Sequence, residues 1–378
     1  MLNRREGLKA ALALIGVAAS RRAMAAPGPA VVPVAEHRNR FFLDVGVNRG
    51  AGYRFVLDTG TNTHIISTRL VEQLRLPKVD RRMVRGYEGV NQESVVGIQR
   101  LTVGGVDLGR ANAVVWGANR LEDHDGLIGY PFLYPDAVLD LAAGRIALGA
   151  GPPADSVEVA AEVGRDQTVL LGGVPGAEGR FVFDTGSQFL TISSGYHHRV
   201  STSEAYRAAA KLVYRAADGS TRTGAFRPDG LAFGELRIRK PVVRIGAADG
   251  SEGVFLDVDG LFGVNVIRPY IWALDQAGGG LEAAPGGPEQ LGYYGSGLAL
   301  STAGGTATIS AVVENGPAHE AGVRPGQPVL ALGGWPPADW DRSFLRAHAL
   351  QDGPGALVLE IIDRGERRTV ELASRRLL

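Results

Sequence analysis

The stretch FVLDTGT at residues 55–61 decides the fold, because it returns almost unchanged as FVFDTGS at residues 181–187. In each copy, apolar residues run into Asp-Thr-Gly and a hydroxyl residue. A strand that enters a tight turn in this way would hold Asp58 and Asp184 on rigid supports, since glycine lets the turn close without a Cβ clash. One such triplet is a common turn sequence, but two copies in equivalent contexts point to a shared role.

Three further blocks repeat in the same order after each triplet, which indicates that the chain is duplicated. They are IIS at 65–67 with LTIS at 190–193, DHDGLIG at 123–129 with DVDGLFG at 257–263, and VLDL at 138–141 with WALD at 272–275. We therefore predict two homologous lobes, over residues 31–150 and residues 160–283.

The composition favours many short strands joined by tight turns. There are 53 glycines, with valine-rich runs between them, and Glu-Gly at 88–89 and Asp-Gly at 218–219 are turn signals. This pattern predicts an all-β fold with strands spaced as in a barrel. Short helices are expected after Thr68 and around residues 203–212.

Two carboxyl groups held face to face cannot both ionise easily, so they share a proton and titrate as a pair. The ionised member takes a proton from water while the protonated member polarises a scissile carbonyl. Gly60 and Gly186 would let backbone N–H groups approach the carboxylates. We also expect hydroxyls at Thr61 and Ser187 to donate to them, which would lower their pKa values and shift the activity optimum towards acid. The sequence does not say which aspartate holds the proton.

Over residues 41–281 the chain resembles the aspartic proteases of the retropepsin and pepsin type. Members carry an apolar-apolar-Asp-Thr-Gly-Ser/Thr turn and an apolar-apolar-Gly segment beneath it, here LIG at 127–129 and LFG at 261–263. The resemblance implies that Asp58 and Asp184 form the catalytic dyad. It also implies that the turns interlock through the hydroxyls of Thr59 and Thr185.

The same resemblance implies hairpin flaps over the cleft near residues 86–95 and 216–223. It implies no cofactor and no metal, and an active monomer, because both triplets lie in one chain. The sequence departs from the pepsin-like pattern at Asn62 and Gln188, where Ser or Thr is usual. Tyr87 lies where a flap tyrosine would be expected, without a clear motif around it.

Residues 284–291 form a Pro/Gly-rich linker in this interpretation, and residues 292–378 resemble a PDZ domain of the bacterial protease-associated kind. The most specific part is residues 317–334, which departs at Gln327, where Asp is usual. A helix is expected over residues 339–350. The resemblance implies that a peptide adds as a strand, with its carboxylate on a glycine-rich loop. We assign that loop to Gly295, Ser296, Gly297 and Leu298. The alternative is a purely structural β-domain with a filled groove.

Residues 1–25 are predicted to be a signal peptide of the twin-arginine type. Arg4-Arg5 precedes an apolar run at 10–19 that is too short to span a bilayer, and an Ala-rich cleavage site follows. Gly7 stands where that motif usually has a bulky apolar residue, so the general secretory route stays open. An uncleaved anchor is the alternative. A cleaved signal predicts a periplasmic protein.

Several other classes of function are disfavoured. The chain has 40 basic and 40 acidic residues and no basic cluster beyond its N-terminus, so neither nucleic acid nor an anionic membrane is an expected partner. It has no cysteine, which excludes thiol chemistry. The two Asp-x-Asp-Gly stretches before residues 127 and 261 resemble calcium loops, but Tyr134 and Arg268 stand where a ligating Glu is needed. We predict that His197-His198 lies in a solvated loop. Residues 193–195 lack the surroundings of a serine nucleophile.

These patterns together predict an exported aspartic endopeptidase that acts on polypeptides, with the PDZ domain recruiting or regulating. The alternative is a retired protease that binds peptides in the periplasm without cutting them, and a third possibility is a protease that cuts only itself or one partner. Both triplets are intact, which favours the enzyme.

Overall fold

A computed structural model describes residues 29–37, 39–86, 89–117, 121, 124–246, 257–287, 293–340 and 355–378. The predicted signal peptide, Tyr87, Asp123 and most of the helix expected over 339–350 lie outside these ranges. The all-β class is confirmed. Within the described residues, no helix is both long and apolar enough to cross a membrane.

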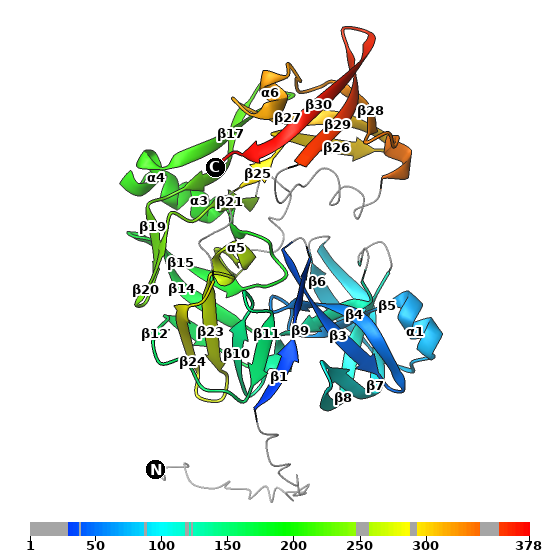
Figure 1. The fold of residues 1–378 in the computed structure, drawn as a ribbon, viewed down its shortest axis with the longest axis vertical. Coiled ribbons are helices and arrows are strands. Elements are labelled where there is room, and N and C mark those ends of the chain that lie inside the picture. The colour runs from blue at the N-terminus through cyan, green and yellow to red at the C-terminus, as the bar shows by residue number, and fades with distance from the viewer. Residues whose placement is uncertain are drawn as a thin grey trace, which may run out of the picture.

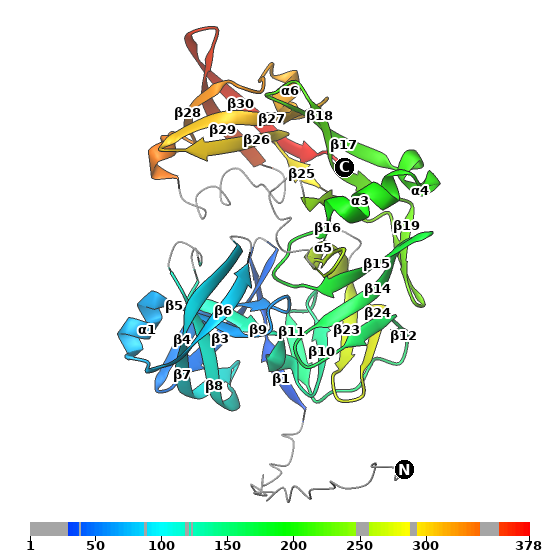
Figure 2. The same cartoon turned by 180° about the vertical axis from the view of Figure 1, so that it is seen from behind.

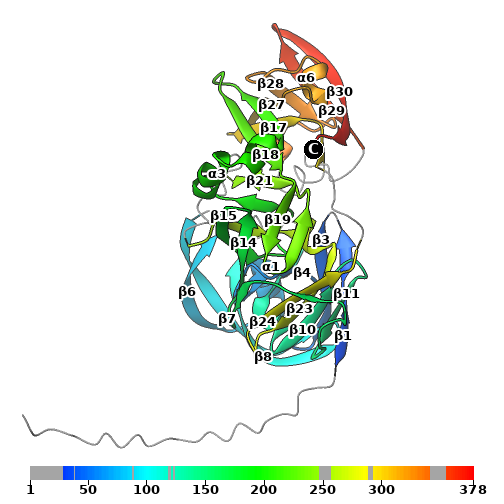
Figure 3. The same ribbon diagram turned by 90° about the vertical axis from the view of Figure 1, so that its left-hand side faces the viewer.

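Lobe 1, the part from residue 35 to residue 129, is a strongly curved sheet (Figures 1 and 3). The outer strand β3 also pairs with β7, which folds the sheet back on itself. Helix α1 (Thr68–Leu74) begins at Ser67, whose hydroxyl accepts from the Leu70 N–H as an N-cap. In spatial order the strands are β2 (Ala35–His37), β3 (Arg40–Val47), β4 (Gly50–Asp58), β9 (Gly126–Gly129), β5 (His64–Ser67), β8 (Val106–Trp116), β7 (Gly89–Val103) and β6 (Lys78–Gly86).

Lobe 2, residues 161–267, repeats the central arrangement of lobe 1. A strand leading to Asp-Thr-Gly pairs in parallel with the strand that ends before Gly263, as β4 does with β9. Its strands are β13 (Ala161–Val163), β14 (Thr168–Val174), β15 (Ala177–Phe183), β16 (Leu190–Ile192), β17 (Ala210–Ala216), β18 (Thr221–Arg227), β19 (Gly230–Phe233), β20 (Leu236–Arg239), β21 (Val243–Ile245) and β22 (Gly260–Phe262).

The helices of lobe 2 differ from the sequence prediction. Helix α3 (Ser194–Ser201) is followed by α4 (Glu204–Ala208), and α5 (Val264–Ile267) follows β22. The helix expected over residues 203–212 is thus shorter, because β17 begins at Ala210 and pairs with β18. The prediction that His197-His198 is a solvated loop is wrong: both lie on α3, and His197 Nε2 is 2.9 Å from the Tyr206 hydroxyl.

A third sheet joins the two lobes with strands from the segments that flank them. Its order is β1 (Ala30–Pro33), β11 (Arg145–Leu148), β10 (Asp136–Asp140), β23 (Tyr270–Asp275), β24 (Gly280–Pro285) and β12 (Val157–Glu158). The central pair places Leu139 opposite Trp272, both fully buried. The expected linker starts later than residue 284, because β24 continues to Pro285 and buried Ala284 pairs with Ile271.

The C-terminal unit, residues 293–378, is a β-structure with its own hydrophobic core around Ile309, Leu332 and Leu359. It consists of β25 (Tyr294–Gly295), β26 (Leu298–Ala303), β27 (Thr306–Val313), α6 (Pro317–Glu320), β28 (Pro328–Leu332), β29 (Gly355–Asp363) and β30 (Glu366–Arg376). Figure 2 shows that this unit sits against lobe 2, where β17 and β27 lie side by side. One sheet therefore continues from lobe 2 into the C-terminal unit.

Candidate active site

Both Asp-Thr-Gly turns follow the end of a central strand and rest on a glycine. Strand β4 ends at Asp58, which pairs with Gly129, and Asp184 directly follows β15. A Cβ on Gly129 would lie 2.3 Å from the Thr63 carbonyl oxygen, and one on Gly263 would lie 2.3 Å from that of Phe189. No side chain fits at either glycine, so the apolar-apolar-Gly segments can pack directly beneath the two turns.

The two turns are locked together by four hydrogen bonds between buried threonines and the backbone. The Thr59 hydroxyl donates to the Phe183 carbonyl (2.7 Å) and accepts from the Thr185 N–H (3.0 Å). The Thr185 hydroxyl donates to the Leu57 carbonyl (2.8 Å) and accepts from the Thr59 N–H (3.1 Å). The structure thus contains the interlock that the resemblance implied, and this fixes the distance between the two aspartates.

Asp58 and Asp184 face each other across this interlock. A Cβ on Gly60 would lie 2.5 Å from the Cγ of Asp184, and one on Gly186 would lie 2.6 Å from the Cγ of Asp58. Each carboxyl group therefore packs on the glycine of the opposite turn, and the two side chains are hydrogen-bonded to each other. The side chains that the sequence singled out as a dyad are brought into one site.

Backbone N–H groups, rather than hydroxyls, bind the carboxylates. Asp58 Oδ1 accepts from Gly60 N (3.0 Å), and Asp184 Oδ1 accepts from Gly186 N (2.8 Å) and Ser187 N (3.2 Å). The expectation for the hydroxyls of Thr61 and Ser187 is wrong.

Each of these hydroxyls donates to a carbonyl two residues further on. Thr61 Oγ1 lies 3.4 Å from the Thr63 oxygen, and Ser187 Oγ lies 2.9 Å from the Phe189 oxygen. These hydroxyls therefore stabilise the turns, and the backbone N–H groups bind the carboxylates.

The two carboxyl groups are electrostatically different. Burial raises the pKa of both, so the expected lowering of their pKa values is also wrong. For Asp184, which is 7% exposed, the negative charge of Asp58 raises the pKa further. For Asp58, the Gly60 N–H, the hydrogen bond from Asp184 and the positive charge of Arg40 oppose the rise. Two carboxyl groups in this arrangement share one proton.

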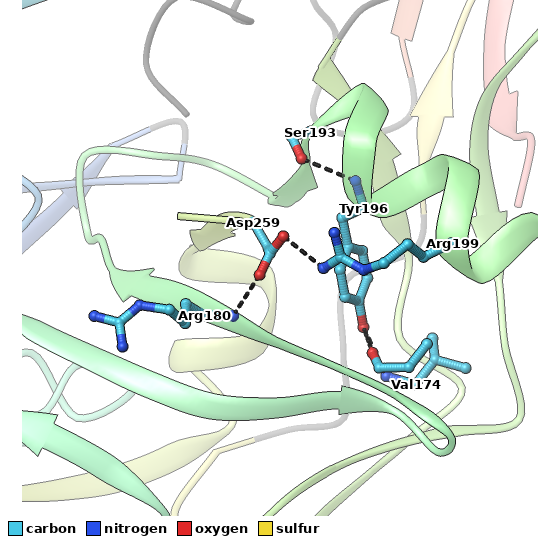
Figure 4. A network of polar contacts seen from close by, with 7 residues as sticks. Val174, Arg180, Ser193, Tyr196, Arg199 and Asp259 are labelled. Atoms are coloured by element: carbon cyan, nitrogen blue, oxygen red, sulfur yellow. Dashed lines mark hydrogen bonds and ion pairs between the residues drawn. The ribbon is translucent and has the colours of Figure 1, made fainter. Parts of the chain in front are cut away.

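A second repeated feature is an aspartate that connects the strand leading to Asp-Thr-Gly with a helix. In lobe 2, Asp259 accepts from Arg180 N (3.0 Å) and from the Arg199 guanidinium (2.6 Å), as Figure 4 shows. Asp125 does the same in lobe 1: it accepts from Arg54 N (2.9 Å) and forms an ion pair with Arg69. From the sequence alone, both aspartates belong to stretches that resemble calcium loops, and this role is not predicted.

The signal that could have revealed this role is the aspartate that directly precedes Gly126 and Gly260, since it is repeated in DHDGLIG and DVDGLFG. Within the described ranges, no three His, Asp or Glu side chains come together as metal ligands would.

Tyr196 connects helix α3 to the β14–β15 hairpin in the same region (Figure 4). Its hydroxyl accepts from the Val174 N–H (3.0 Å) and donates to the Ala177 carbonyl (2.6 Å). Its own N–H donates to Ser193 Oγ (3.1 Å). Ser193 is therefore the N-cap of α3, in agreement with its rejection as a nucleophile.

The two hairpins predicted to be flaps differ. In lobe 1, β6 and β7 form a long hairpin, and its tip at residues 87–88 lies outside the described ranges. In lobe 2, the predicted flap is the end of the β17–β18 hairpin, but β17 pairs with β27 and aligns Tyr214 with Val313. This hairpin is part of the continuous sheet, so the prediction of a second free flap is not supported by this pairing.

The loop assigned to peptide binding lies in the C-terminal unit, between β25 and β26. Ser296 is buried and its carbonyl accepts from the Ala318 N–H, while Gly297 has φ +76° and its carbonyl accepts from the Val313 N–H. Gly295 ends β25 and Leu298 begins β26. These residues belong to a part of the fold separate from the aspartate pair.

Comparison with known families supports the class that this geometry defines. Residues 43–132 match the model of the family described as aspartyl protease, a stretch that includes both Asp58 and Gly129. No curated protein matches the chain. The match supports a retropepsin-like aspartyl protease domain in this stretch, and with it hydrolase chemistry at the level of the family.

Proposed function

We propose that this protein is an aspartic endopeptidase whose dyad is Asp58 and Asp184. The observation that carries the proposal is the threonine interlock, which holds the two carboxyl groups against each other's glycine. A structural role alone would not require two buried carboxyl groups to face each other, since such a pair costs free energy unless it shares a proton.

We assign a role to each aspartate, with the shared proton on Asp184. Asp58, the ionised member, takes a proton from a water molecule as the water oxygen bonds to the scissile carbonyl carbon. Asp184 gives its proton to the carbonyl oxygen, which yields a neutral tetrahedral diol. The proton on Asp58 then passes to the leaving nitrogen, the C–N bond breaks, and Asp184 recovers a proton from the diol hydroxyl. The amide N–H groups of Gly60, Gly186 and Ser187 hold both carboxyl groups in place throughout.

We further propose that residues 1–25 export the protein to the periplasm and that the C-terminal unit binds a peptide segment as a PDZ domain would. Among the described strands, β26 pairs only with β27, so its other edge can accept an added strand. The glycine-rich loop that includes Gly297 adjoins the start of β26. A bound polypeptide would then be recruited to, or regulate, the protease site.

The rival reading is a protein that holds peptides without cutting them. A cleavage assay on an unfolded protein across pH 3–8 separates the two, with Asp58→Ala compared with the wild type. The matched control is Asp107→Ala, which removes an exposed carboxylate that pairs with Arg100 at 2.9 Å. The proposal predicts cleavage by the wild type and the control and none by Asp58→Ala. Equal cleavage in all three would mean that Asp58 is not needed for the cleavage, and cleavage by none of them would favour the binding protein.

A further inference from the structure

His64 contacts the support of the Asp58 turn directly. It is the first residue of β5, six residues after Asp58, and it is partly buried. Its Nδ1 accepts a hydrogen bond from the Gly129 N–H at 3.2 Å. Gly129 is the residue that pairs with Asp58 at the end of the parallel β4–β9 ladder. A single side chain thus connects β5 to the glycine on which the catalytic turn rests.

Gly129 packs tightly against the backbone of the turn that follows Asp58. The carbonyl oxygens of Thr61 and Thr63 lie so near that a Cβ on Gly129 would be 2.9 Å and 2.3 Å from them. The next N–H, that of Tyr130, donates to the Thr61 carbonyl at 2.9 Å. A shift of Gly129 would therefore move the residues that follow Asp58 in the turn.

We propose that His64 is a positioning residue for the aspartate pair, and that it acts only while its ring is neutral with the Nδ1 lone pair directed at Gly129. This inference rests on the proposed function. It assigns to His64 a role in which its protonation at low pH disturbs the support of the Asp58 turn.

Lobe 2 connects the equivalent segments by a different contact, which has no titratable group. The position equivalent to His64 is Leu190, and its N–H donates to the side-chain oxygen of Asn265 at 2.6 Å. The Asn265 amide nitrogen donates to the Val242 carbonyl at 2.9 Å, which fixes the orientation of the amide. An amide oxygen accepts a hydrogen bond at every pH at which the protein folds, so this second connection cannot be lost by protonation.

Protonation of His64 would break the hydrogen bond between its Nδ1 and the Gly129 N–H. An imidazolium carries a hydrogen on both nitrogens, so the Nδ1–H would face the Gly129 N–H, and two donors cannot bond to each other. Burial lowers the pKa of His64 to about 4 and is the only cause of the shift.

Charged neighbours do not contribute to this shift. Of the strands next to β5, β8 carries Asp107 and Arg110 and β9 carries no charged residue, while helix α1, which also packs against β5, carries Arg69 and Glu72. On β8, the residue that pairs with His64 is Ala113. Protonation of His64 should therefore add to the acid limb of activity that protonation of Asp58 itself produces.

Two variants and a control test the role through the pH profile of cleavage by the full chain. His64→Asn keeps an acceptor near the Nδ1 position but cannot titrate, and His64→Leu copies lobe 2 and removes the acceptor. At pH 6, we expect His64→Asn to keep activity within about threefold and His64→Leu to lose about tenfold or more, because displaced catalytic groups are costly. Below pH 5, His64→Asn should retain activity that the wild type loses. The control, His197→Asn, removes a partly buried histidine of α3 and should leave the acid limb unchanged.

A second measurement does not depend on activity and separates failure of this inference from failure of the proposed function. Nitrogen-15 NMR of the histidine rings in the full chain should show His64 as the Nε2–H tautomer at pH 7, with a pKa below 5. An Nδ1–H tautomer, a pKa near 6.5, or an acid limb that is the same in His64→Asn and the wild type would each overturn the inference. If the wild type does not cleave, the tautomer and pKa still decide whether His64 holds Gly129.

Discussion

The hairpins that follow the two catalytic turns occupy equivalent places and have different surroundings. The lobe 1 hairpin of β6 and β7 has its outer strand at the edge of the sheet and carries exposed apolar residues, Val79, Met83 and Val90. The lobe 2 hairpin has its outer strand, β17, paired with the C-terminal unit. The comparison shows that two similar hairpins differ in their outer strands: β6 lies at the edge of its sheet, and β17 is paired with β27 of the C-terminal unit.

The anchor consists of several kinds of contact. Val313 of β27 packs with Leu212 in a small buried cluster, and the Arg215 guanidinium pairs with Glu314 at 3.1 Å. The ring of Tyr293 lies 5.3 Å from that of Phe189, and the carbonyl of Phe189 accepts from the Ser187 hydroxyl of the catalytic turn. Phe189 thus contacts both Tyr293 of the C-terminal unit and Ser187 of the Asp184 turn. Among the described residues, we find no corresponding link from the C-terminal unit to the Asp58 turn.

The largest effect is expected at the glycines of the turns, where the halves are most alike. Gly186→Ala would place a methyl group 2.6 Å from the Asp58 Cγ, so the dyad must separate. Cleavage should fall by about a hundredfold, the typical result of displacing catalytic groups by an ångström. Gly60→Ala should cause a similar loss of cleavage, because its methyl group would lie 2.5 Å from the Asp184 Cγ.

The matched control is Gly195→Ala on helix α3, whose nearest contact would be Ser193 Oγ at 3.9 Å. Circular dichroism would establish that all three variants fold. If Gly186→Ala and Gly60→Ala cleaved as fast as Gly195→Ala, the opposition of the two turns would not be required for activity.

The next largest effect should distinguish the two hairpins. Val313 is 2% exposed, so Val313→Asp places a carboxylate in the cluster that joins β17 to β27. We expect a loss of about 3 kcal/mol in the free energy of unfolding, as is usual for a buried unpaired charge. Val79→Asp on the free hairpin, at a side chain that is 55% exposed, should change stability by less than about 0.5 kcal/mol. Equal losses measured in urea would mean that the lobe 2 hairpin is no more firmly anchored.

A third prediction uses pH to compare the aspartates. Because the pKa of folded Asp184 is raised well above 3.8, the folded state retains a proton that the unfolded state releases, and stability falls as pH rises from about 3.8 through the raised value. The Asp184→Asn variant has no carboxyl group to ionise here, so it does not lose stability in this way. The melting temperature of the variant, relative to that of the wild type, should therefore increase with pH over that window.

The same measurement on Asp58→Asn should give a smaller increase, since the rise in the Asp58 pKa is opposed by Arg40 and by the hydrogen bond from Asp184. Histidine protonation acts in the opposite sense: the lowered pKa of His64 makes the fold less stable as pH falls from 6.5 through about 4. A larger increase for Asp58→Asn would place the shared proton on Asp58 instead.

The smallest effect is expected from the ion pair at the anchor. Arg215→Gln breaks the contact with Glu314, in which the two side chains are 64% and 35% exposed, so the loss should be about 0.5 kcal/mol. The control is Arg222→Gln on the same hairpin, where the partner is the exposed Asp218 and not the C-terminal unit. A loss above about 2 kcal/mol for Arg215→Gln would show that this pair, rather than the buried cluster, dominates the anchor.

The sequence was sufficient for the features that depend on local pattern. Apolar residues before each triplet predicted the strands that lead to Asp58 and Asp184, and the repeat of the triplet predicted that the two would meet. The sequence could not predict which donors the carboxylates use. The hydroxyls of Thr61 and Ser187 can donate either to the carboxylates or to the backbone carbonyls two residues further on. The choice depends on backbone geometry in the folded turn.

Pairing between distant segments was the other limit. Nothing in the AKLVYRA stretch at residues 210–216 distinguishes a flap strand from one that pairs with β27. The hydrogen bond from Gly129 to His64 spans 65 residues, and a lone histidine after a turn carries no pattern that predicts its partner. Such contacts follow from the assembled lobes and not from the spacing within either one.

The sheet shared by the lobes has a consequence for how the site responds to concentration. Strands β10 and β23 meet at its centre, and fully buried Leu139 and Trp272 face each other there. A site assembled from two separate chains disappears on dilution because its halves part. In this chain the halves are covalently linked and share a backbone ladder, so we expect the rate per molecule to stay constant however scarce the protein becomes.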